Sequence, residues 1–279
     1  MPYSRRQFVR IVPALGAFAV PALAHGLDGA PPDPPVWPSP EPARGTPVDD
    51  SFPSHHPSLA KEIVGVSHFN LARVKELLQQ HPSLAKASWD WGYGDWETAL
   101  GAASHVGNRN IAELLLANGA PPTLCSATML GQLEVVKAFI AATPGVQRTP
   151  GPHGLSLMVH ARLGGPPAAA VVTYLESLGD ADQPLPSEPL SPEDRALVEG
   201  TYSFGERPRD SFVVNTDKQF GLMLTRAGAT ARAIRHLGRL EFAPAGAPAV
   251  RIRFERDGAK IVALTVSDPD VIVRAKKTM

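Results

Sequence analysis

The chain has 279 residues, and its 27 basic and 27 acidic side chains give a formal net charge of zero. This length allows one large or two modest domains, and a balanced charge without a clustered basic surface argues against a nucleic-acid partner. Cys125 is the single cysteine, so an intrachain disulfide is excluded and the fold depends on packing alone.

The N-terminal segment has the pattern of an export signal. An arginine pair within residues 4–10 precedes an apolar stretch from Ile11 to Leu23, and small residues at 22–24 offer a cleavage site. The apolar stretch is too short to cross a bilayer comfortably. The segment resembles a twin-arginine signal; an ordinary secretory signal with two arginines is the alternative. We expect residues 1–24 to be a signal peptide, the folded protein to be exported to a bacterial periplasm, and no stable membrane span to remain after cleavage.

A proline-rich segment follows the signal. Residues 25–50 contain repeated Pro-Pro and Pro-x-Pro steps and few residues that could form a core, so they are predicted to be a disordered linker. Proline-rich runs can also dock in an aromatic groove of a partner protein, but a plain linker is the favoured interpretation.

The middle of the chain contains an internal repeat. Residues 63–78, 100–115 and 124–139 each predict a short helix with small residues, a Gly or Asn turn and a second, amphipathic helix; a fourth unit is predicted over 156–182. One such helix pair cannot cover its own apolar face, so the pairs must stack. Gly107 and Gly131, and Asn70 as the next best residue, are predicted to adopt the left-handed conformation that ends a helix.

Two motifs in this region resemble ankyrin repeats. Residues 98–103, Thr-Ala-Leu-Gly-Ala-Ala, are similar to the T-P-L-H-x-A signature of the family, and Asn118-Gly119-Ala120 is similar to its turn after the second helix. The resemblance implies an α-helical ankyrin-repeat solenoid of about four irregular repeats over residues 51–183. It also implies a protein partner, bound by the loops between repeats and the adjacent concave helix face. Another helical-hairpin solenoid is the alternative fold.

The C-terminal part changes to the period of β-structure. Residues 184–199 are predicted to be a linker and a short helix that begins at Ser191-Pro192. About seven short strands then lie between residues 211 and 274, separated by turns. They predict an antiparallel meander curled into a small barrel or half-barrel over residues 200–279. This region loosely resembles β modules appended to some bacterial serine hydrolases, which implies an accessory role and no catalytic residue.

An aromatic loop between the first two repeats is the candidate partner-binding site. Large aromatic side chains anchor many protein interfaces, and interleaved acids can accept hydrogen bonds. The alternative is that the rings pack against the inner helices, with Asp95 or Thr98 capping the next helix. The predicted partner-binding residues are Trp89, Asp90, Trp91, Tyr93, Asp95 and Trp96.

No metal site, cofactor or catalytic residue is expected. His68 and His105 occupy equivalent repeat positions and could share a metal ion, but no carboxylate or thiol accompanies them at ligand spacing. Hydrogen bonding at helix ends is therefore the favoured role for both. His153 lies in a Gly-Pro-His-Gly turn without a visible ligand set. Neither a hydrolase motif nor a nucleotide-binding motif occurs, and Cys125 has no activating base in the sequence, so the protein is predicted not to be an enzyme.

These observations together predict an exported, non-catalytic ankyrin-repeat scaffold that mediates protein–protein interaction in the bacterial cell envelope. Two alternatives remain open. A sugar or lipid could bind inside the β region, in a cavity lined by Phe212, Phe220, Leu222, Ile252 and Phe254; a filled core would exclude this. A cryptic hydrolase would require a pocket in which a histidine and an acid converge beside a nucleophile.

Overall fold

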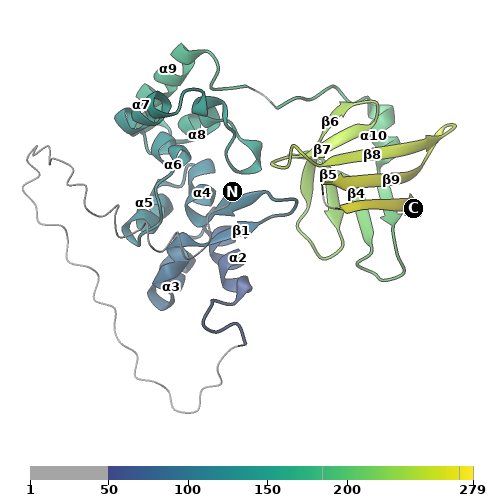
Figure 1. The fold of residues 1–279 in the computed structure, drawn as a ribbon, viewed down its shortest axis with the longest axis horizontal. Helices are drawn as coiled ribbons and strands as arrows, with labels where there is room; N and C mark the ends of the chain where they lie inside the picture. The colour runs from purple at the N-terminus through teal and green to yellow at the C-terminus, as the bar shows by residue number, and fades with distance from the viewer. Residues whose placement is uncertain (1–49, 184, 270, 279) are drawn as a thin grey trace, which may run out of the picture. The chain divides into compact units, whose positions relative to one another are not determined.

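A computed structural model describes residues 50–183, 185–269 and 271–278. The expected signal peptide at 1–24 and nearly all of the expected linker at 25–50 lie outside these residues. Residues Asp49–Met279 form one compact unit, in which helices come first along the chain and strands follow (Figure 1). The predicted α + β class is therefore confirmed. Among the described residues, no helix combines the length and the apolar character needed to cross a bilayer.

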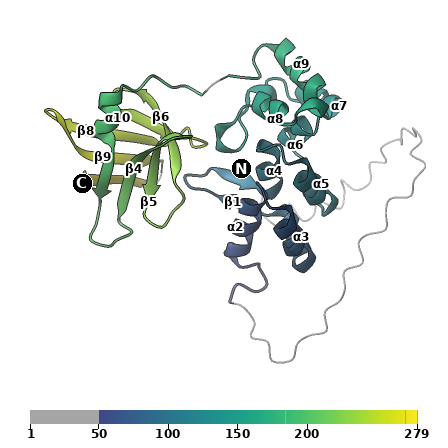
Figure 2. The same ribbon diagram turned by 180° about the vertical axis from the view of Figure 1, so that it is seen from behind.

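Eight helices of the first region form four consecutive pairs, as predicted. The first helix of each pair contacts the first helix of the next, so α4 lies against α2 and α6, and α6 against α8. The pairs follow one another in the same order in Figure 2. They are α2 (Pro57–Val66) with α3 (Leu71–Gln80), α4 (Ala99–His105) with α5 (Arg109–Ala117), α6 (Leu124–Met129) with α7 (Leu133–Ala142), and α8 (Leu157–Leu163) with α9 (Ala169–Leu178).

Short connecting elements complete this region. A hairpin of β1 (Ser88–Asp90) and β2 (Trp96–Thr98) separates the first two helix pairs. Four single turns of 3₁₀-helix occur in the connections: η1 (Pro82–Lys86), η2 (Val146–Arg148), η3 (Pro152–Gly154) and η4 (Pro166–Ala168).

Polar caps define where many of these helices begin. In five helices, the residue before the first turn accepts a hydrogen bond from a backbone N–H three residues further on, which satisfies a donor that the helix leaves free. The capping residues are Asn70, Thr98, Asn108, Thr123 and Ser156. Thr98 thus has the capping role proposed for it from the sequence.

Two glycines are required by both conformation and space. Gly107 and Gly131 have φ values of 71° and 77°, as predicted. A Cβ atom on Gly107 would lie 2.3 Å from the Leu163 carbonyl oxygen, and one on Gly131 would lie 2.1 Å from that of Pro167. The prediction for Asn70 was wrong. Its φ is −121°, because its side chain caps α3 and does not end α2.

Small and branched apolar residues fill the helical core. Ala102, Ala103 and Ile111 are fully buried, and they belong to one cluster with Leu77 and Leu115. Alanine side chains on α4 let the inner helices approach closely, while the larger residues come from the second helix of each pair. Burial of one leucine or isoleucine contributes roughly 1.5–3 kcal/mol, so contacts between neighbouring pairs supply much of the stability here.

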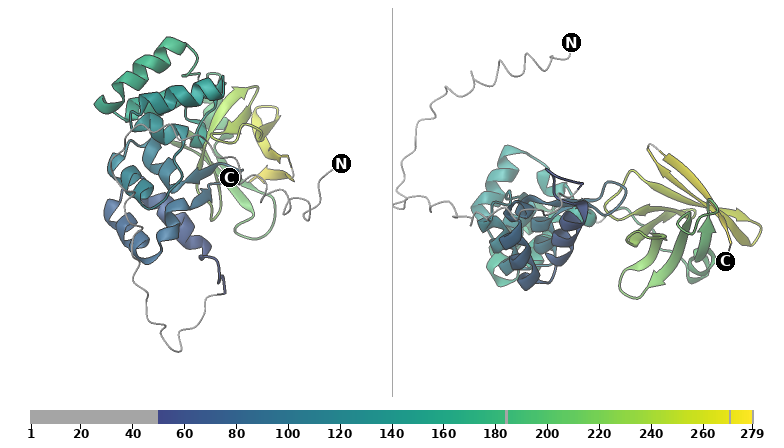
Figure 3. Two further views of the ribbon diagram at one scale, coloured as in Figure 1. Left: turned by 60° about the vertical axis from the view of Figure 1, so that its left-hand side comes forward. Right: turned by 90° about the horizontal axis from the view of Figure 1, so that it is seen from below.

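The C-terminal region is a closed antiparallel barrel of eight strands, drawn in green to yellow in Figure 3. Each strand pairs with the next along the chain, and β10 returns to pair with β3 through Lys276–Ser203 and Lys277–Tyr202. The strands are β3 (Gly200–Ser203), β4 (Ser211–Asp217), β5 (Gly221–Arg226), β6 (Arg232–Gly238), β7 (Glu241–Pro244), β8 (Arg251–Asp257), β9 (Lys260–Asp268) and β10 (Val271–Lys277).

The expected antiparallel meander is confirmed, and of the two arrangements left open, barrel and half-barrel, the structure has the closed barrel. The seven strands predicted between 211 and 274 are present, and the extra strand β3 pairs with both β4 and β10. Closing a sheet on itself removes the unpaired backbone groups of its two edges. The predicted short helix is α10 (Pro192–Val198), capped by the Ser191 hydroxyl.

Large side chains pack inside the barrel. Tyr202 and Phe242 are fully buried, and the Tyr202 hydroxyl donates to the Val198 carbonyl of α10 at 2.6 Å. Four of the five residues expected to line a ligand cavity belong to this packed cluster: Phe212, Leu222, Ile252 and Phe254. Phe220 is instead 61% exposed and does not line the interior. Binding of a sugar or lipid in the β region stays a prediction.

Candidate metal centre

The β1–β2 hairpin carries the aromatic loop and brings Glu97 into the interior. Trp89 and Glu97 are opposite each other in the two strands, and the connecting turn uses positive φ angles at Gly92, Tyr93 and Gly94. Side chains alternate between the two faces of a strand, so Trp96 is 62% exposed while Glu97 is 1% exposed. Contacts of β1 with α2 and of β2 with α4 hold the hairpin on the helices.

The six predicted partner-binding residues do not share one environment. Trp89 and Trp91 pack against the helical core, whereas Trp96 points into solvent. Asp90 makes a local turn by accepting from the Gly92 backbone N–H at 2.8 Å, and Asp95 is buried. Packing and exposure therefore apply to different members of the loop, and its role in binding a partner stays a prediction.

Three histidines converge on Glu97 from separate parts of the chain. His68 follows α2, His105 ends α4, and His153 lies in η3. His105 Nε2 is 2.8 Å from Glu97 Oε1, His153 Nε2 is 3.3 Å from the same oxygen, and His68 Nε2 is 3.6 Å from Oε2. His68 Nε2 and His105 Nε2 are 3.0 Å apart. One ligand atom from each of the four residues lies within 4.8 Å of every other.

Outer hydrogen bonds determine which nitrogen faces the cluster. His68 Nδ1 lies 2.9 Å from the Gly65 carbonyl oxygen, and His153 Nδ1 lies 2.7 Å from Asp95 Oδ2. Both oxygens only accept, so each Nδ1 must carry the proton that it donates. The neutral imidazoles of His68 and His153 therefore present the lone pair of Nε2 to the cluster. Histidine ligands of metal ions are oriented by outer bonds of this kind.

Asp95 fixes His153 in an otherwise unfavourable conformation. His153 has φ 58°, which is uncommon for a residue with a side chain. Asp95 accepts from its backbone N–H at 3.0 Å and from its Nδ1 at 2.7 Å, so one carboxylate holds both the main chain and the ring. The Asp95 carboxylate is also paired with the guanidinium of Arg232 in β6.

Glu97 supplies a buried anion with one oxygen turned to the histidines. Trp91 Nε1 donates to Oε2 at 2.7 Å, while Oε1 has no well-aligned hydrogen-bond donor among the described residues. Burial raises the pKa of Glu97, but its contacts with His105 and His153 outweigh this effect and lower the pKa to about 2. Glu97 is therefore a carboxylate at neutral pH.

Neutral imidazoles leave this arrangement incompletely paired. The Nε2 lone pair of His153 lies against an anionic oxygen, which is repulsive unless a proton or a metal cation lies between them. His105 can carry a single proton on Nε2, which cannot satisfy both His68 Nε2 and Glu97 Oε1. A divalent cation among the four ligand atoms would accept all of these lone pairs at once.

The donor set fits a transition-metal ion. Imidazole nitrogen with one carboxylate oxygen suits Zn²⁺, and also Fe, Ni or Cu ions, better than Mg²⁺ or Ca²⁺. Ligands at zinc distances in a tetrahedron are ~3.4 Å apart. The separations of 2.8 and 3.3 Å from Glu97 Oε1 to two histidine Nε2 atoms, and of 3.0 Å between the Nε2 atoms of His68 and His105, are slightly shorter than this value. The histidine side chains are 23%, 11% and 23% exposed, so an ion can reach the site from solvent.

A metal shared by His68 and His105 was considered from the sequence, but hydrogen bonding was favoured for both. No role was predicted for Glu97, and His153 was noted only as a turn residue. The equivalent repeat positions of His68 and His105 were a usable signal for half of the site. A fully buried fifth histidine, His160 in α8, lies outside the group of four, and burial lowers its pKa.

Comparisons of the chain with protein-family models, with curated proteins and with solved structures found no match.

Proposed function

We propose that the helical region binds one divalent transition-metal ion of the Zn²⁺ type. The ligands are His68 Nε2, His105 Nε2, His153 Nε2 and Glu97 Oε1. One observation carries the proposal. Hydrogen bonds from Nδ1 of His68 and His153 to outer oxygens leave the Nε2 lone pair of each ring facing the buried carboxylate of Glu97. Asp95 and Gly65 supply those outer bonds, and Trp91 leaves Oε1 of Glu97 free for the ion.

The ion would act mainly as a structural link. Four protein ligands complete a tetrahedral zinc site, whereas a catalytic zinc keeps one position for water or substrate. The ligands come from the end of α2, the hairpin, α4 and the η3 loop, which are separate segments of the chain. One ion would therefore hold the aromatic loop and the η3 loop on the inner helices. This role agrees with a protein that is not an enzyme.

The ankyrin-type scaffold is the second part of the proposal. Support comes from the four helix pairs with successive contacts between their first helices and from Trp96, which is 62% exposed at the edge of the hairpin. In this proposal the metal ion keeps the hairpin rigid, and a rigid aromatic anchor loses little conformational entropy when a partner binds. Export to the periplasm belongs to the same proposal.

Metal titration of the full chain tests the first part. After treatment with a chelator and its removal, Zn²⁺ is added in competition with a chromophoric chelator of known affinity. We expect one ion per chain with a Kd of about 1 µM or tighter, which corresponds to ~8 kcal/mol. Glu97→Gln removes an anionic ligand and should weaken binding at least 100-fold. Asp95→Asn removes no ligand but changes the carboxylate that holds His153 and pairs with Arg232, and it should weaken binding about 10–100-fold.

His55→Gln is the matched control. His55 is an exposed histidine whose ring bonds Ser83, so its loss should leave zinc affinity unchanged. Circular dichroism of each variant shows whether the helices are retained. Binding weaker than about 100 µM in the unmodified chain, or equal affinity in Glu97→Gln and His55→Gln, would rule out the proposed site.

A further inference from the structure

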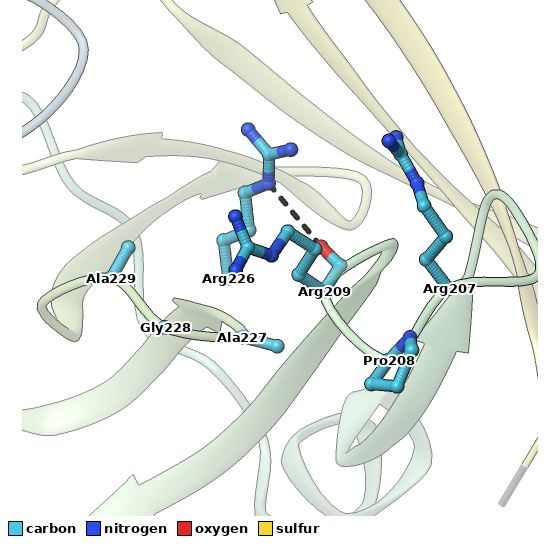
Figure 4. A pocket seen from close by; sticks show the side chains of 7 residues that line it. All are labelled: Arg207, Pro208, Arg209, Arg226, Ala227, Gly228 and Ala229. Atoms are coloured by element: carbon cyan, nitrogen blue, oxygen red, sulfur yellow. Dashed lines mark hydrogen bonds between the residues drawn. The ribbon is translucent and has the colours of Figure 1, made fainter.

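The barrel has a depression lined by arginines, separate from the metal centre. Its volume is about 900 Å³. The β3–β4 loop forms one side, and the end of β5 with the turn after it forms the other (Figure 4). Both belong to the same end of the barrel, because antiparallel strands alternate in direction. The lining residues are Arg207, Pro208, Arg209, Arg226, Ala227, Gly228 and Ala229.

A buried acid holds the first arginine in place. Arg207 donates from Nε and Nη2 to the two oxygens of Asp210, both at 2.9 Å, and the Asp210 side chain is only 8% exposed. This two-point ion pair fixes the plane of the guanidinium. It leaves Nη1 without a partner among the described residues, so that edge of the group remains available.

The other two arginines have no acidic partner in the described part of the chain. Arg226 lies over the Phe204 ring at 5.6 Å, and its Nε donates a long hydrogen bond of 3.5 Å to the Arg209 carbonyl. The Arg209 guanidinium forms neither a hydrogen bond nor an ion pair with any described residue. Figure 4 shows the side chains of Arg209 and Arg226 next to each other, with Arg207 across the depression.

Several other arginines of the same barrel are paired with acids. Arg251 and Arg253 both contact Glu241, and Arg274 contacts Glu255. Neighbouring like charges repel, so an anion placed between the adjacent guanidinium groups of Arg209 and Arg226 would relieve this repulsion.

The turn opposite Arg207 leaves space for a ligand. Residues 227–229 have only small side chains, and a Cβ atom added to Gly228 would meet nothing within 4 Å. A bound group can approach the main chain there without displacing a side chain. The volume falls in the range typical of small-molecule sites.

We propose that Arg207, Arg209 and Arg226 form a binding site for a small molecule that carries a phosphate- or sulfate-type oxyanion. The planar guanidinium presents paired N–H donors that match the oxygens of such a group. Asp210 positions Arg207, and the Phe204 ring supports Arg226. The site does not depend on the metal centre, so an experiment can disprove either proposal and leave the other unaffected.

Titration with inorganic pyrophosphate tests this site. Amide shifts of the full chain are followed by NMR at constant ionic strength set with sodium chloride. We expect saturable shifts confined to residues 205–211 and 226–230. Because each substitution removes charge-assisted hydrogen bonds to the bound anion, Arg209→Gln and Arg226→Gln should each weaken binding at least roughly tenfold.

Arg256→Gln is the control, because it removes the same charge from the opposite end of the barrel, where Arg256 precedes the β8–β9 turn. It should leave pyrophosphate affinity unchanged. Shifts that do not saturate, or an equal loss of affinity in Arg256→Gln and Arg226→Gln, would show general charge attraction and overturn the proposal. A zinc titration of Arg226→Gln should match that of the unmodified chain.

Discussion

The helical region and the barrel bury different kinds of side chain. In the barrel, Tyr202, Phe242 and Ile252 form an apolar interior, and Asp210 and Arg232 are its buried charged residues among those described. In the helical region, the interior also contains Asp95, Glu97 and His160. Buried charges cost stability unless they are paired. Two buried carboxylates, Asp95 and Glu97, beside the histidine cluster are therefore the feature that a folding requirement alone does not explain.

The two regions also close their cores differently. Each helix pair is completed by the next pair along the chain, so most contacts are local in sequence. The barrel closes only when β10 reaches β3, about 75 residues earlier, through Lys277 and Tyr202. A locally connected region can be tightened by a clamp such as a metal ion, whereas a closed sheet needs no such link. The following predictions test this contrast, beginning with the largest expected effect.

Chelation should destabilise the helical region selectively. At free Zn²⁺ about 1,000-fold above Kd, binding to the folded state adds ~4 kcal/mol, and a chelator removes it. Hydrogen exchange, read by mass spectrometry, should accelerate in α4 and in residues 149–156 but not in β8 and β9. Equal acceleration in both regions would contradict the prediction that the metal ion stabilises the helical region and not the barrel.

Acid should weaken the metal-free helical region through Glu97. Its pKa in the folded protein is about 2, below the ordinary value of 4.5, because its contacts with His105 and His153 favour the carboxylate and outweigh the effect of burial. The carboxylate therefore contributes stability that is fully present above about pH 4.5 and is lost as the pH falls toward 2. The contribution is on the order of 3 kcal/mol. Urea unfolding in EDTA between pH 6 and 2.5 should show a steeper loss in the unmodified chain than in Glu97→Gln.

Gly131→Ala should destabilise the contact between neighbouring helix pairs. Gly179→Ala is a close control, because the two glycines have φ values of 77° and 74° and so carry the same left-handed penalty, about 1–2 kcal/mol. Only Gly131 faces a backbone oxygen at 2.1 Å; nothing lies within 4 Å of a Cβ on Gly179. Overpacking should add about 1–3 kcal/mol to the cost at Gly131, measured by urea unfolding. Similar losses in both variants would show that space there is not limiting.

Tyr202→Phe should weaken the barrel alone. The variant removes the 2.6 Å hydrogen bond to Val198 and leaves a buried carbonyl without this partner, which costs about 1–3 kcal/mol. Tyr174→Phe, in the outer helix α9, provides the comparison, and its unfolding free energy should change by less than about 0.5 kcal/mol. Zinc affinity should be the same in both variants; a loss in Tyr202→Phe would mean that the barrel supports the metal centre.

The sequence determined the local elements of both regions. Small residues with i, i+3 and i+4 apolar spacing gave the helix pairs, Thr98 and Ser191 marked helix starts, and period-two patterns located seven strands. These features depend on neighbours within a few residues, so they can be read from the chain. The wrong prediction at Asn70 was also a local one, since an asparagine between two helices can either end the first helix or cap the second.

Only the tertiary structure decided which distant residues meet. Barrel closure depends on the register between β3 and β10, and the metal centre depends on His153 returning beside His105 after 48 further residues. Metal ligands need matching positions in space and have no fixed spacing when they come from four separate segments. The lone pairs of His68 and His153 became visible only when Gly65 and Asp95 were placed against their outer nitrogens. The repeat therefore predicted the helices that carry His68 and His105, and only long-range packing brought Glu97 and His153 beside them.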